Sequence, residues 1–427
     1  MMGFFYYASV FMLGFRGIEL KGIKIADLFI VFLFLAMLYR IILKNERLRW
    51  NRKFLGLTGL VIAGVLVSLL KVDDFTYAKL DPFRYILVGM FATSIIHYLD
   101  SKEKIIKTFK VLLLAGVISA VASLIVFSLW TAGYEGVAPF LHHIETGEAE
   151  GRAMPFFYDP NHYGGFLIIP IIVASYFLLT SVDRDDSKNN WLYYLVELVL
   201  ITALVTTGSR SAVGAVTVAW GAIITFHLIT AHWDRLSFET TNRLAKNLIL
   251  VSLIAAMILL WFGYSQIGKS FEVERYGKVK GGFKTRLQLW SASLIAFGNN
   301  PIIGVGTSDF VNEYPRIARR HGFDPETQFF PHNTYIGLLS ELGLVGGLSG
   351  LLLIAYVFLK GWQNVIRSSG SGLLVILLSL FTAQAAHMFF LSMFHARRLW
   401  FVFALIIGAS LFIGVETQNK DRGRTLS

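Results

Sequence analysis

The chain has 427 residues, of which 55% are hydrophobic and only 16% are charged, and its mean hydropathy is +0.59. Soluble globular proteins carry about 25% charged residues. The composition therefore excludes an ordinary soluble domain and, despite the net charge of +11, a soluble nucleic-acid-binding domain. The absence of cysteine excludes disulfides and thiolate metal sites.

Apolar blocks follow one another along the chain, and a block of about 20 residues spans a bilayer as a helix. The blocks are continuous rather than alternating, which excludes a membrane β-barrel. We predict an all-α polytopic membrane protein, a single GT-C-like bundle over residues 1–427 with about twelve spans. The predicted spans cover residues 1–15, 25–43, 54–70, 83–99, 108–130, 163–180, 191–207, 211–230, 247–264, 334–358, 372–394 and 399–415.

The first block, "MMGFFYYASVFMLGFRG", lacks a basic start and a small-residue cleavage site, so we expect it to remain as the first span. With the N-terminus inside, 20 of the 39 Lys and Arg residues lie in cytoplasmic loops and ten lie in short outer loops. Because Lys and Arg accumulate in short cytoplasmic loops, both termini are predicted to be cytoplasmic.

Two predicted outer loops are long enough to hold structure of their own. Residues 131–161 form a mildly acidic loop, and residues 265–333 form a large loop between spans nine and ten. The large loop carries nine Lys and Arg residues against six Asp and Glu residues. Membrane topology does not require cations there, so the excess predicts an anionic ligand. The loop cations predicted to bind it include Arg316, Arg319 and Arg320.

The large loop also contains helical patterns. Apolar residues recur at helical spacing from Phe283 to Leu294, which predicts an amphipathic helix over 283–298 on the membrane surface. The turn residues of "NNPIIGVG" end that helix. A second helix is predicted near 308–320, bent at Pro315.

"TTGSRSAVGA" is predicted to be a tight outer turn between two spans. Gly208 and Ser209 can cap the following helix, whose free N–H groups favour an anion. Arg210 adds a planar fork of donors that matches phosphate. The alternative is an arginine that only extends its charge to water from a helix end.

"PHNTYIGLLSELGLVGG" opens the tenth predicted span. His332 has the side chain best suited to take a proton near neutral pH, although a helix cap at Asn333 with a surface histidine is the alternative. Glu341 lies too far along the same helix to pair with His332, so we expect it to pair across the bundle. Gly343 and Gly346 belong to a glycine stripe that predicts close helix packing.

Other polar residues stand near the predicted outer ends of spans. Asp159 and Asn161, in "FFYDPNHYGG", form a turn and cap signal and are also candidates to face an outer cavity. Arg286 lies on the predicted surface helix. Arg397 and Arg398 oppose the positive-inside pattern, which favours a ligand-binding role for both. Clustered carboxylates of the kind that hold a catalytic metal are not evident, so no metal is predicted.

Several of these stretches resemble the bacterial O-antigen ligase and polymerase superfamily. The segment from 332 is similar to its signature of His, Asn, nine residues and Gly-x-x-Gly. "TRLQLWSASLIAFGNNPIIGVG" is similar to its outer-loop segment, "GSR" to its turn, and "DPN" to the entrance of its sixth span. The motifs extend over about 155–350. The matching positions include His332, Asn333, Gly343, Gly346, Arg210, Arg286, Trp290, Pro301, Gly304 and Gly306.

The resemblance implies a multi-pass enzyme of the bacterial inner membrane with its active site facing the periplasm. Its donor would be a glycan linked to undecaprenyl diphosphate, and its reaction an inverting transfer to an acceptor hydroxyl without metal or cofactor. His332 would act as the base, and Arg210 and Arg286 would bind the diphosphate. The resemblance adds Asn333, Asp159 and Asn161 as substrate-binding residues. The charge pattern of the chain adds the predicted substrate-binding residues Arg316, Arg319, Arg320, Arg397 and Arg398.

A ligase would use the lipid A–core oligosaccharide as acceptor, and a polymerase would use a second lipid-linked repeat unit. We favour the ligase because its signature fits and because nine loop cations suit a phosphate-rich core. Polymerases are described by two R-x10-G patterns, and only Arg210 to Gly221 supplies one here. The alternatives are a polymerase, a protein O-glycosyltransferase and a transporter, although the internal repeats and broken spans of transporters are not visible.

Overall fold

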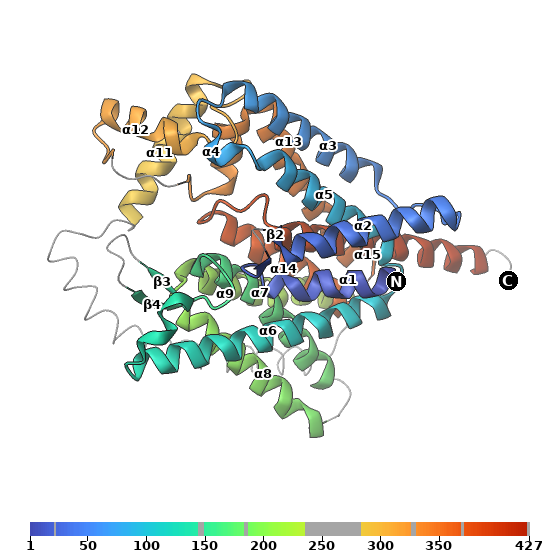
Figure 1. The fold of residues 1–427 in the computed structure, drawn as a ribbon. Helices are drawn as coiled ribbons and strands as arrows, with labels where there is room; N and C mark the ends of the chain where they lie inside the picture. Colours follow the sequence, from blue (N-terminus) through green and yellow to red (C-terminus); the bar gives the residue numbers. More distant parts are fainter. Residues whose placement is uncertain are drawn as a thin grey trace.

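The structure, a computed structural model, is a bundle of helices with two short β-hairpins (Figure 1). It describes residues 1–20, 23–143, 149–182, 187–234, 283–325, 330–368 and 371–424. Predicted span nine, 247–264, lies outside the described residues, as do residues 265–282 and 326–329 of the predicted large loop.

The helices follow the predicted apolar blocks closely. They are α1 (Met2–Phe11), α2 (Ile25–Leu43), α3 (Arg52–Ser68), α5 (Asp81–Tyr98), α6 (Lys102–Thr131), α7 (Pro160–Val182), α8 (Ser187–Thr206), α9 (Arg210–Asp234), α13 (Thr334–Arg367), α14 (Gly372–Met388) and α15 (Arg397–Arg424). Each of the predicted spans that falls on described residues is largely helical. Among the described residues, five stretches are long and apolar enough to cross a membrane, namely α2, Arg52–Lys71, α6, Pro160–Thr180 and α13. The chain is therefore an α-helical membrane protein, and the count of twelve spans stays a prediction.

Shorter elements occupy the connections. They are η1 (Met12–Gly14), β1 (Glu19–Leu20), β2 (Ile23–Lys24), η2 (Leu69–Lys71), α4 (Phe75–Ala78), η3 (Glu135–Phe140), β3 (Leu141–His143), β4 (Ala149–Ala153), α11 (Phe283–Asn299) and α12 (Phe310–His321). The antiparallel pairs β1–β2 and β3–β4 were not expected from an all-α prediction. The β3–β4 hairpin lies in the predicted loop 131–161.

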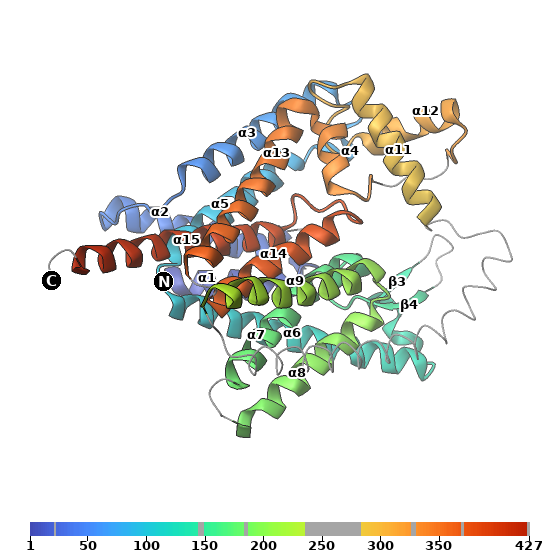
Figure 2. The same ribbon diagram turned by 180° about the vertical axis from the view of Figure 1, so that it is seen from behind.

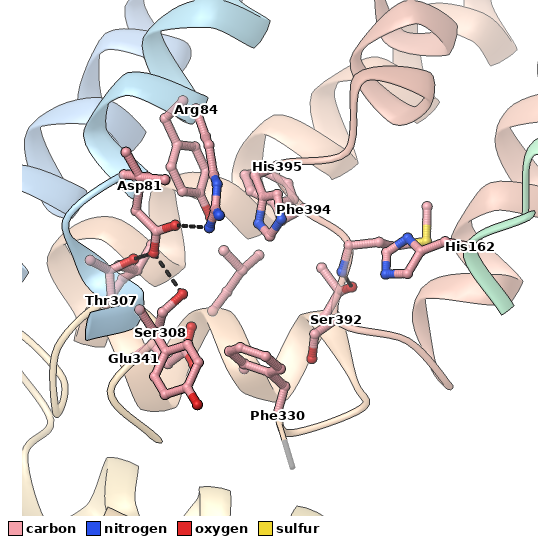
Figure 3. A pocket seen from close by; sticks show the side chains of 18 of the residues that line it. Asp81, Arg84, His162, Thr307, Ser308, Phe330, Glu341, Ser392, Phe394 and His395 are labelled. Atoms are coloured by element: carbon pink, nitrogen blue, oxygen red, sulfur yellow. Dashed lines mark hydrogen bonds and ion pairs between the residues drawn. The ribbon is translucent and has the colours of Figure 1, made fainter. Parts of the chain in front are cut away.

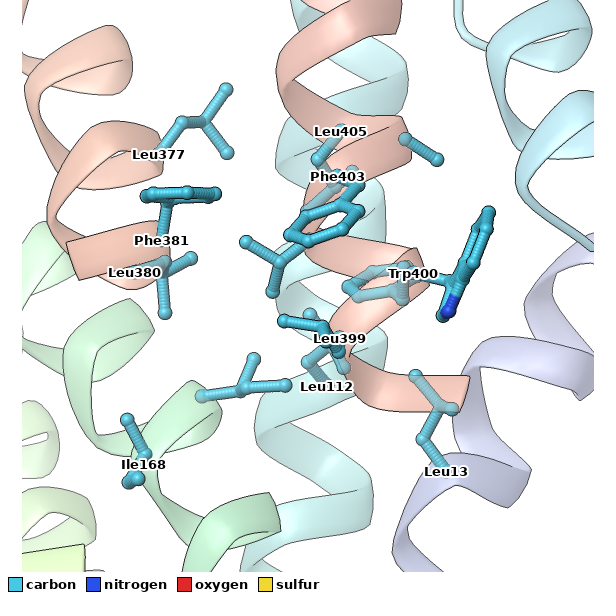
Figure 4. Close-up of a cluster of buried hydrophobic side chains, with 14 of the residues drawn as sticks. Leu13, Leu112, Ile168, Leu377, Leu380, Phe381, Leu399, Trp400, Phe403 and Leu405 are labelled. Carbon is cyan, nitrogen blue, oxygen red and sulfur yellow. The ribbon is translucent and has the colours of Figure 1, made fainter. Parts of the chain in front are cut away.

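The bundle has inner and outer helices. In α7, 89% of the apolar stretch is buried inside the bundle, against 28% in α2. The outer helices keep apolar side chains exposed, as expected for a surface that faces lipid. The inner helices α14 and α15 meet around Phe381, Trp400 and Phe403 (Figure 4). The Trp400 indole Nε1 donates a hydrogen bond to the Phe394 carbonyl at 2.6 Å, so the N–H donor of the buried ring is satisfied.

The two ends of the chain lie at the same end of the bundle. Figures 1 and 2 show β3, β4, α11 and α12 at the opposite end, which we call the loop end. This arrangement agrees with termini on one side and both predicted large loops on the other. Which side faces the periplasm stays a prediction.

The two predicted loop helices are confirmed as α11 and α12, and Pro315 lies inside α12. They pack on each other through a small core of their own, in which Leu289 meets Phe310 and its neighbours. Leu287 and Leu294 of α11 remain exposed. These two residues belong to the apolar stripe that we expect to face the membrane surface.

Helix α13 is broken, which corrects the expectation of unbroken spans. Gly343 has φ 61° and ψ −159°, so the helical hydrogen bonds stop there. The "PIIGVG" segment replaces them. Its backbone bonds to α13 are Leu344 N to Pro301 O (2.8 Å), Val345 N to Ile302 O (3.1 Å), Val305 N to Ser340 O (2.9 Å) and Gly306 N to Glu341 O (3.1 Å). A break in an apolar bundle is tolerated when protein groups satisfy the freed backbone in this way.

Glycines permit this close approach. A Cβ on Gly343 would lie 2.4 Å from the Ile302 carbonyl carbon, and one on Gly304 would lie 2.3 Å from the Glu341 carbonyl oxygen. Gly346 instead packs against α3. A Cβ on Gly64 of α3 would lie 2.2 Å from the Cα of Gly346. The predicted packing role of the glycine stripe is therefore confirmed at Gly346, but at Gly343 the glycine serves the break.

We expect Gly343→Ala to lower the free energy of unfolding by at least about 1–3 kcal/mol, because an alanine is strained at positive φ and its Cβ meets backbone atoms. Thermal unfolding of the purified protein in detergent measures the change. Gly214→Ala, in α9 with open space around a Cβ, is the matched control and should be neutral or stabilising. Equal unfolding temperatures for Gly343→Ala and the wild type would contradict this account of the break.

Candidate active site

The start of α13 positions His332 at the loop end of the bundle. Asn333 caps the helix, because its Oδ1 accepts hydrogen bonds from the amides of Tyr335 (3.0 Å) and Ile336 (3.1 Å). The cap that the sequence offered as the alternative for Asn333 is thus present, and contact with substrate stays a prediction for that residue. His332 itself has φ 50°. A non-glycine residue in the left-handed region costs about 1–3 kcal/mol and is common at functional sites.

The segment after α14 connects His332 to α11. Span eleven was predicted to continue to residue 394, but α14 ends at Met388. The chain then turns across the start of α13, where Thr334 Oγ1 donates to the Leu391 carbonyl at 2.6 Å and accepts from the Met393 amide at 3.1 Å. The Phe390 ring of this segment lies 5.5 Å from Arg286 Cζ of α11. A cation above an aromatic face is attracted to it, so the segment holds Arg286 near the start of α13.

The environment of His332 keeps its imidazole neutral. Burial lowers the His332 pKa to about 4, and the positive charge of Arg286 contributes in the same direction. The Asp159 carboxylate opposes this shift and raises the pKa by a smaller amount. At neutral pH the ring is therefore uncharged and able to accept a proton.

Three arginines from three different elements lie near one another, and we call them the arginine cluster: Arg152 of β4, Arg210 of α9 and Arg286 of α11. Burial lowers the Arg286 pKa, and the charges of Arg210 and Arg152 lower it further. Arg152 Nε donates to the Thr207 carbonyl at 2.9 Å, and its Nη2 donates to Asn161 Oδ1 at 3.2 Å. Like charges gathered in this way favour an anion between them.

The turn before α9 depends on its glycine. Gly208 has φ 62°, and the Ser209 amide donates to Thr207 Oγ1 at 3.1 Å. A Cβ on Gly208 would lie 3.0 Å from Arg152 Nε. The turn therefore brings Arg152 against the start of α9, where Arg210 is the first helical residue. Sequence reasoning missed Arg152, and the available signal was that it is the one Lys or Arg in the acidic loop 131–161.

Asp159 and His162 open α7. Asp159 Oδ1 accepts a hydrogen bond from the His162 amide at 2.9 Å, which confirms the predicted cap. His162 Nδ1 lies 3.1 Å from Arg16 Nη1 and 3.2 Å from Arg398 Nη1, so it accepts from both guanidinium groups. Burial, and to a smaller extent neighbouring arginines, lowers the Arg16 pKa to about 10. Arg398 is thus a buried cation beside Asp159, and its contact with substrate stays a prediction.

Four other predicted substrate-binding arginines lie elsewhere. Arg397 forms an ion pair with Asp27 of α2. Arg316 pairs with Asp73 at 2.8 Å and with Glu313 at 3.2 Å on the surface of α12. Arg319 and Arg320 are exposed in the last turn of α12. Within the described residues, no interaction joins these four side chains to the arginine cluster, and their contact with substrate stays a prediction.

A cavity of about 360 Å³ opens beside the start of α13 (Figure 3). Thr334 and His162 belong to its wall, so it adjoins His332 and the entrance of α7. Asp81 and Arg84 of α5 and Glu341 of α13 also line it. Sequence reasoning did not single out Asp81 or Arg84, although an acid and a base one turn apart at a span entrance were the available signal.

The comparisons with known proteins bear on this arrangement. Residues 195–351 match the family model described as O-Antigen ligase. The matched segment runs from α8 into α13 and includes Arg210, Arg286 and His332. Among curated proteins, none matches the chain. The family match agrees with the motifs of the sequence, and residues 195–351 of the chain are a segment of the O-antigen ligase superfamily.

Proposed function

We propose that the protein transfers a glycan from a polyprenyl-diphosphate donor to an acceptor hydroxyl at the loop end of the bundle. The observation that carries the proposal is the arginine cluster beside a neutral histidine, within and next to the segment that matches the O-Antigen ligase family. The family match supports the class of reaction, and the geometry supports the roles of the residues.

The arginine cluster suits the leaving group. Departure of a glycan from polyprenyl diphosphate leaves charge on the diphosphate oxygens, and guanidinium groups bind such oxygens in pairs. The first amides of α9, beside Arg210, add donors of the kind that helix N-termini offer to phosphate. An anion also relieves the mutual repulsion of Arg152, Arg210 and Arg286. In this proposal the arginines supply the positive charge, and the reaction needs no metal.

His332 suits the acceptor. The acceptor oxygen attacks the anomeric carbon, the bond from that carbon to the diphosphate oxygen breaks, and the hydroxyl proton passes to the neutral imidazole. A single displacement of this kind inverts the anomeric configuration. The nearby Asp159 carboxylate raises the His332 pKa because its negative charge stabilises the protonated ring. The same attraction stabilises the imidazolium that forms in the reaction.

The acceptor that we propose is the lipid A–core oligosaccharide, which makes the protein an O-antigen ligase. The ligase signature at residue 332 and the nine cations of the predicted large loop support this choice over polymerisation of lipid-linked repeat units, and the matching family covers both reactions. We further propose that the protein lies in the bacterial inner membrane with the loop end in the periplasm and both termini in the cytoplasm, and that the donor is the undecaprenyl-diphosphate-linked glycan.

Deletion of the gene tests this function. We expect long glycan to accumulate on the lipid carrier while the lipopolysaccharide runs on a gel without it, because polymerisation continues and attachment stops. Expression of the wild-type chain should restore the ladder. Lipopolysaccharide capped by a single repeat would identify a polymerase instead, and an unchanged ladder would contradict glycan transfer.

A further inference from the structure

The cavity beside His332 contains two carboxylates in different states. Asp81 is saturated: its Oδ2 accepts from Thr307 Oγ1 and from Ser308 Oγ, both at 2.7 Å, and its Oδ1 accepts from Arg84 Nη1 at 2.9 Å. These bonds hold the loop that follows the "PIIGVG" segment against α5. Asp81 therefore stabilises the wall of the cavity and has little capacity left for a ligand.

Glu341 is the second carboxylate, and it is not saturated. The Ser308 amide hydrogen bonds to its carboxyl group, and Ser308 has φ 52°, a costly conformation for a serine. Among the described residues, no donor reaches Glu341 Oε1, although that atom is buried. A buried carboxylate oxygen without a partner is rare in native structures, because its desolvation is not compensated. The ligand of the cavity is the natural donor.

The rest of the cavity has aromatic walls and single polar groups. Tyr77 and Phe330 pack edge to face with ring centroids 6.2 Å apart, and Phe394 lies 6.2 Å from a further tyrosine ring. Ser392 Oγ, across the cavity from Glu341 in Figure 3, also has no partner among the described residues. Aromatic faces suit the C–H faces of a sugar ring, and a carboxylate and a hydroxyl suit its hydroxyl groups.

We infer that this cavity binds a sugar residue of a substrate glycan, and that Glu341 accepts a hydrogen bond from one of its hydroxyl groups. The inference rests on the proposed function. Glu341 lies seven residues after Thr334, the first residue of α13, and so about 10 Å along the helix from the end beside His332. That distance is too large for the sugar at Glu341 to be the reacting one, so the cavity holds a neighbouring residue of the acceptor or of the donor glycan.

Steady-state kinetics of the full-length protein in proteoliposomes test the inference. The probes are lipid-linked glycan and lipopolysaccharide without O-glycan, both extracted from the gene-deleted strain, with one varied while the other is saturating. We expect Glu341→Gln to raise the KM for one of them by up to about 10-fold, because an amide oxygen in this position is a weaker acceptor than a carboxyl group that can also adjust its proton, with kcat little changed. Glu103→Gln, exposed at the start of α6 at the opposite end of the bundle, is the matched control.

The two substrates distinguish the source of the sugar. A higher KM for lipopolysaccharide places an acceptor sugar in the cavity, and a higher KM for the lipid-linked glycan places a donor sugar there. Ser392→Ala, on the opposite wall, should raise the same KM and keeps the test decisive if Glu341→Gln folds poorly. Unchanged KM values in the folded variants, beside an active wild type and an impaired His332→Gln, would overturn the sugar site alone. A wild type without transfer activity would overturn the proposed function.

Discussion

His332→Ala and His332→Gln lower the turnover of glycan transfer by about 10²- to 10⁴-fold, the usual contribution of a general base. Glutamine retains a hydrogen-bonding side chain but does not take the proton, so a large loss in that variant indicates base chemistry. Both variants should still insert into the membrane and bind the lipid-linked donor. Turnover near the wild-type value in His332→Gln would show that the histidine only orients the acceptor.

The dependence of the rate on pH distinguishes a neutral base at His332 from a protonated imidazolium. The base must be neutral to accept a proton, and burial lowers the His332 pKa from its ordinary value of 6.5 to about 4. We therefore expect kcat/KM, which reports on the free enzyme, to stay constant as the pH falls through 6.5. It should decline only when the pH approaches about 4. A bound anion raises the imidazole pKa, so the decline in kcat should occur at a higher pH. A rate that rises as the pH falls would instead assign the imidazolium to diphosphate departure.

Arg286→Ala and Arg210→Ala each lower transfer by at least about 10²- to 10³-fold, the cost of removing one donor that stabilises developing negative charge. Arg→Lys at either position recovers little, because an ammonium group lacks the planar fork that binds two phosphate oxygens. Transfer assays at saturating acceptor measure the effect. Arg152→Lys should behave in the same way, although it also loses the bonds to Thr207 and Asn161.

The control for these variants is Arg367→Lys, an exposed arginine at the far end of α13 from His332. It should leave the rate unchanged. We also expect the wild-type rate to survive EDTA. Loss of activity on chelation, restored by magnesium or manganese, would contradict a mechanism in which arginines alone neutralise the diphosphate. Full activity in Arg210→Lys would mean that positive charge at the start of α9 is sufficient.

Several features of the molecule follow from short stretches of sequence. The ends of α2 coincide with those of its apolar block, and α11 and α12 appear where helical spacing predicts them. The turn at Gly208 and the cap at Asp159 lie where turn and cap residues indicate them. These properties are local, because the length of an apolar run, its periodicity and a residue's φ preference act within a few positions of the chain.

Other features depend on partners that are distant in the sequence. The break at Gly343 is stable because residues near 302 supply the missing backbone hydrogen bonds, and no pattern within α13 reveals them. Arg397 pairs with Asp27, which lies near the other end of the chain. Local sequence also does not distinguish Asp81 from Glu341. Residues of another loop saturate Asp81 with hydrogen bonds, whereas one oxygen of Glu341 has no donor within the described part of the chain. Burial and hydrogen bonding between remote segments set the chemistry of each side chain, and these arise only when the helices are packed.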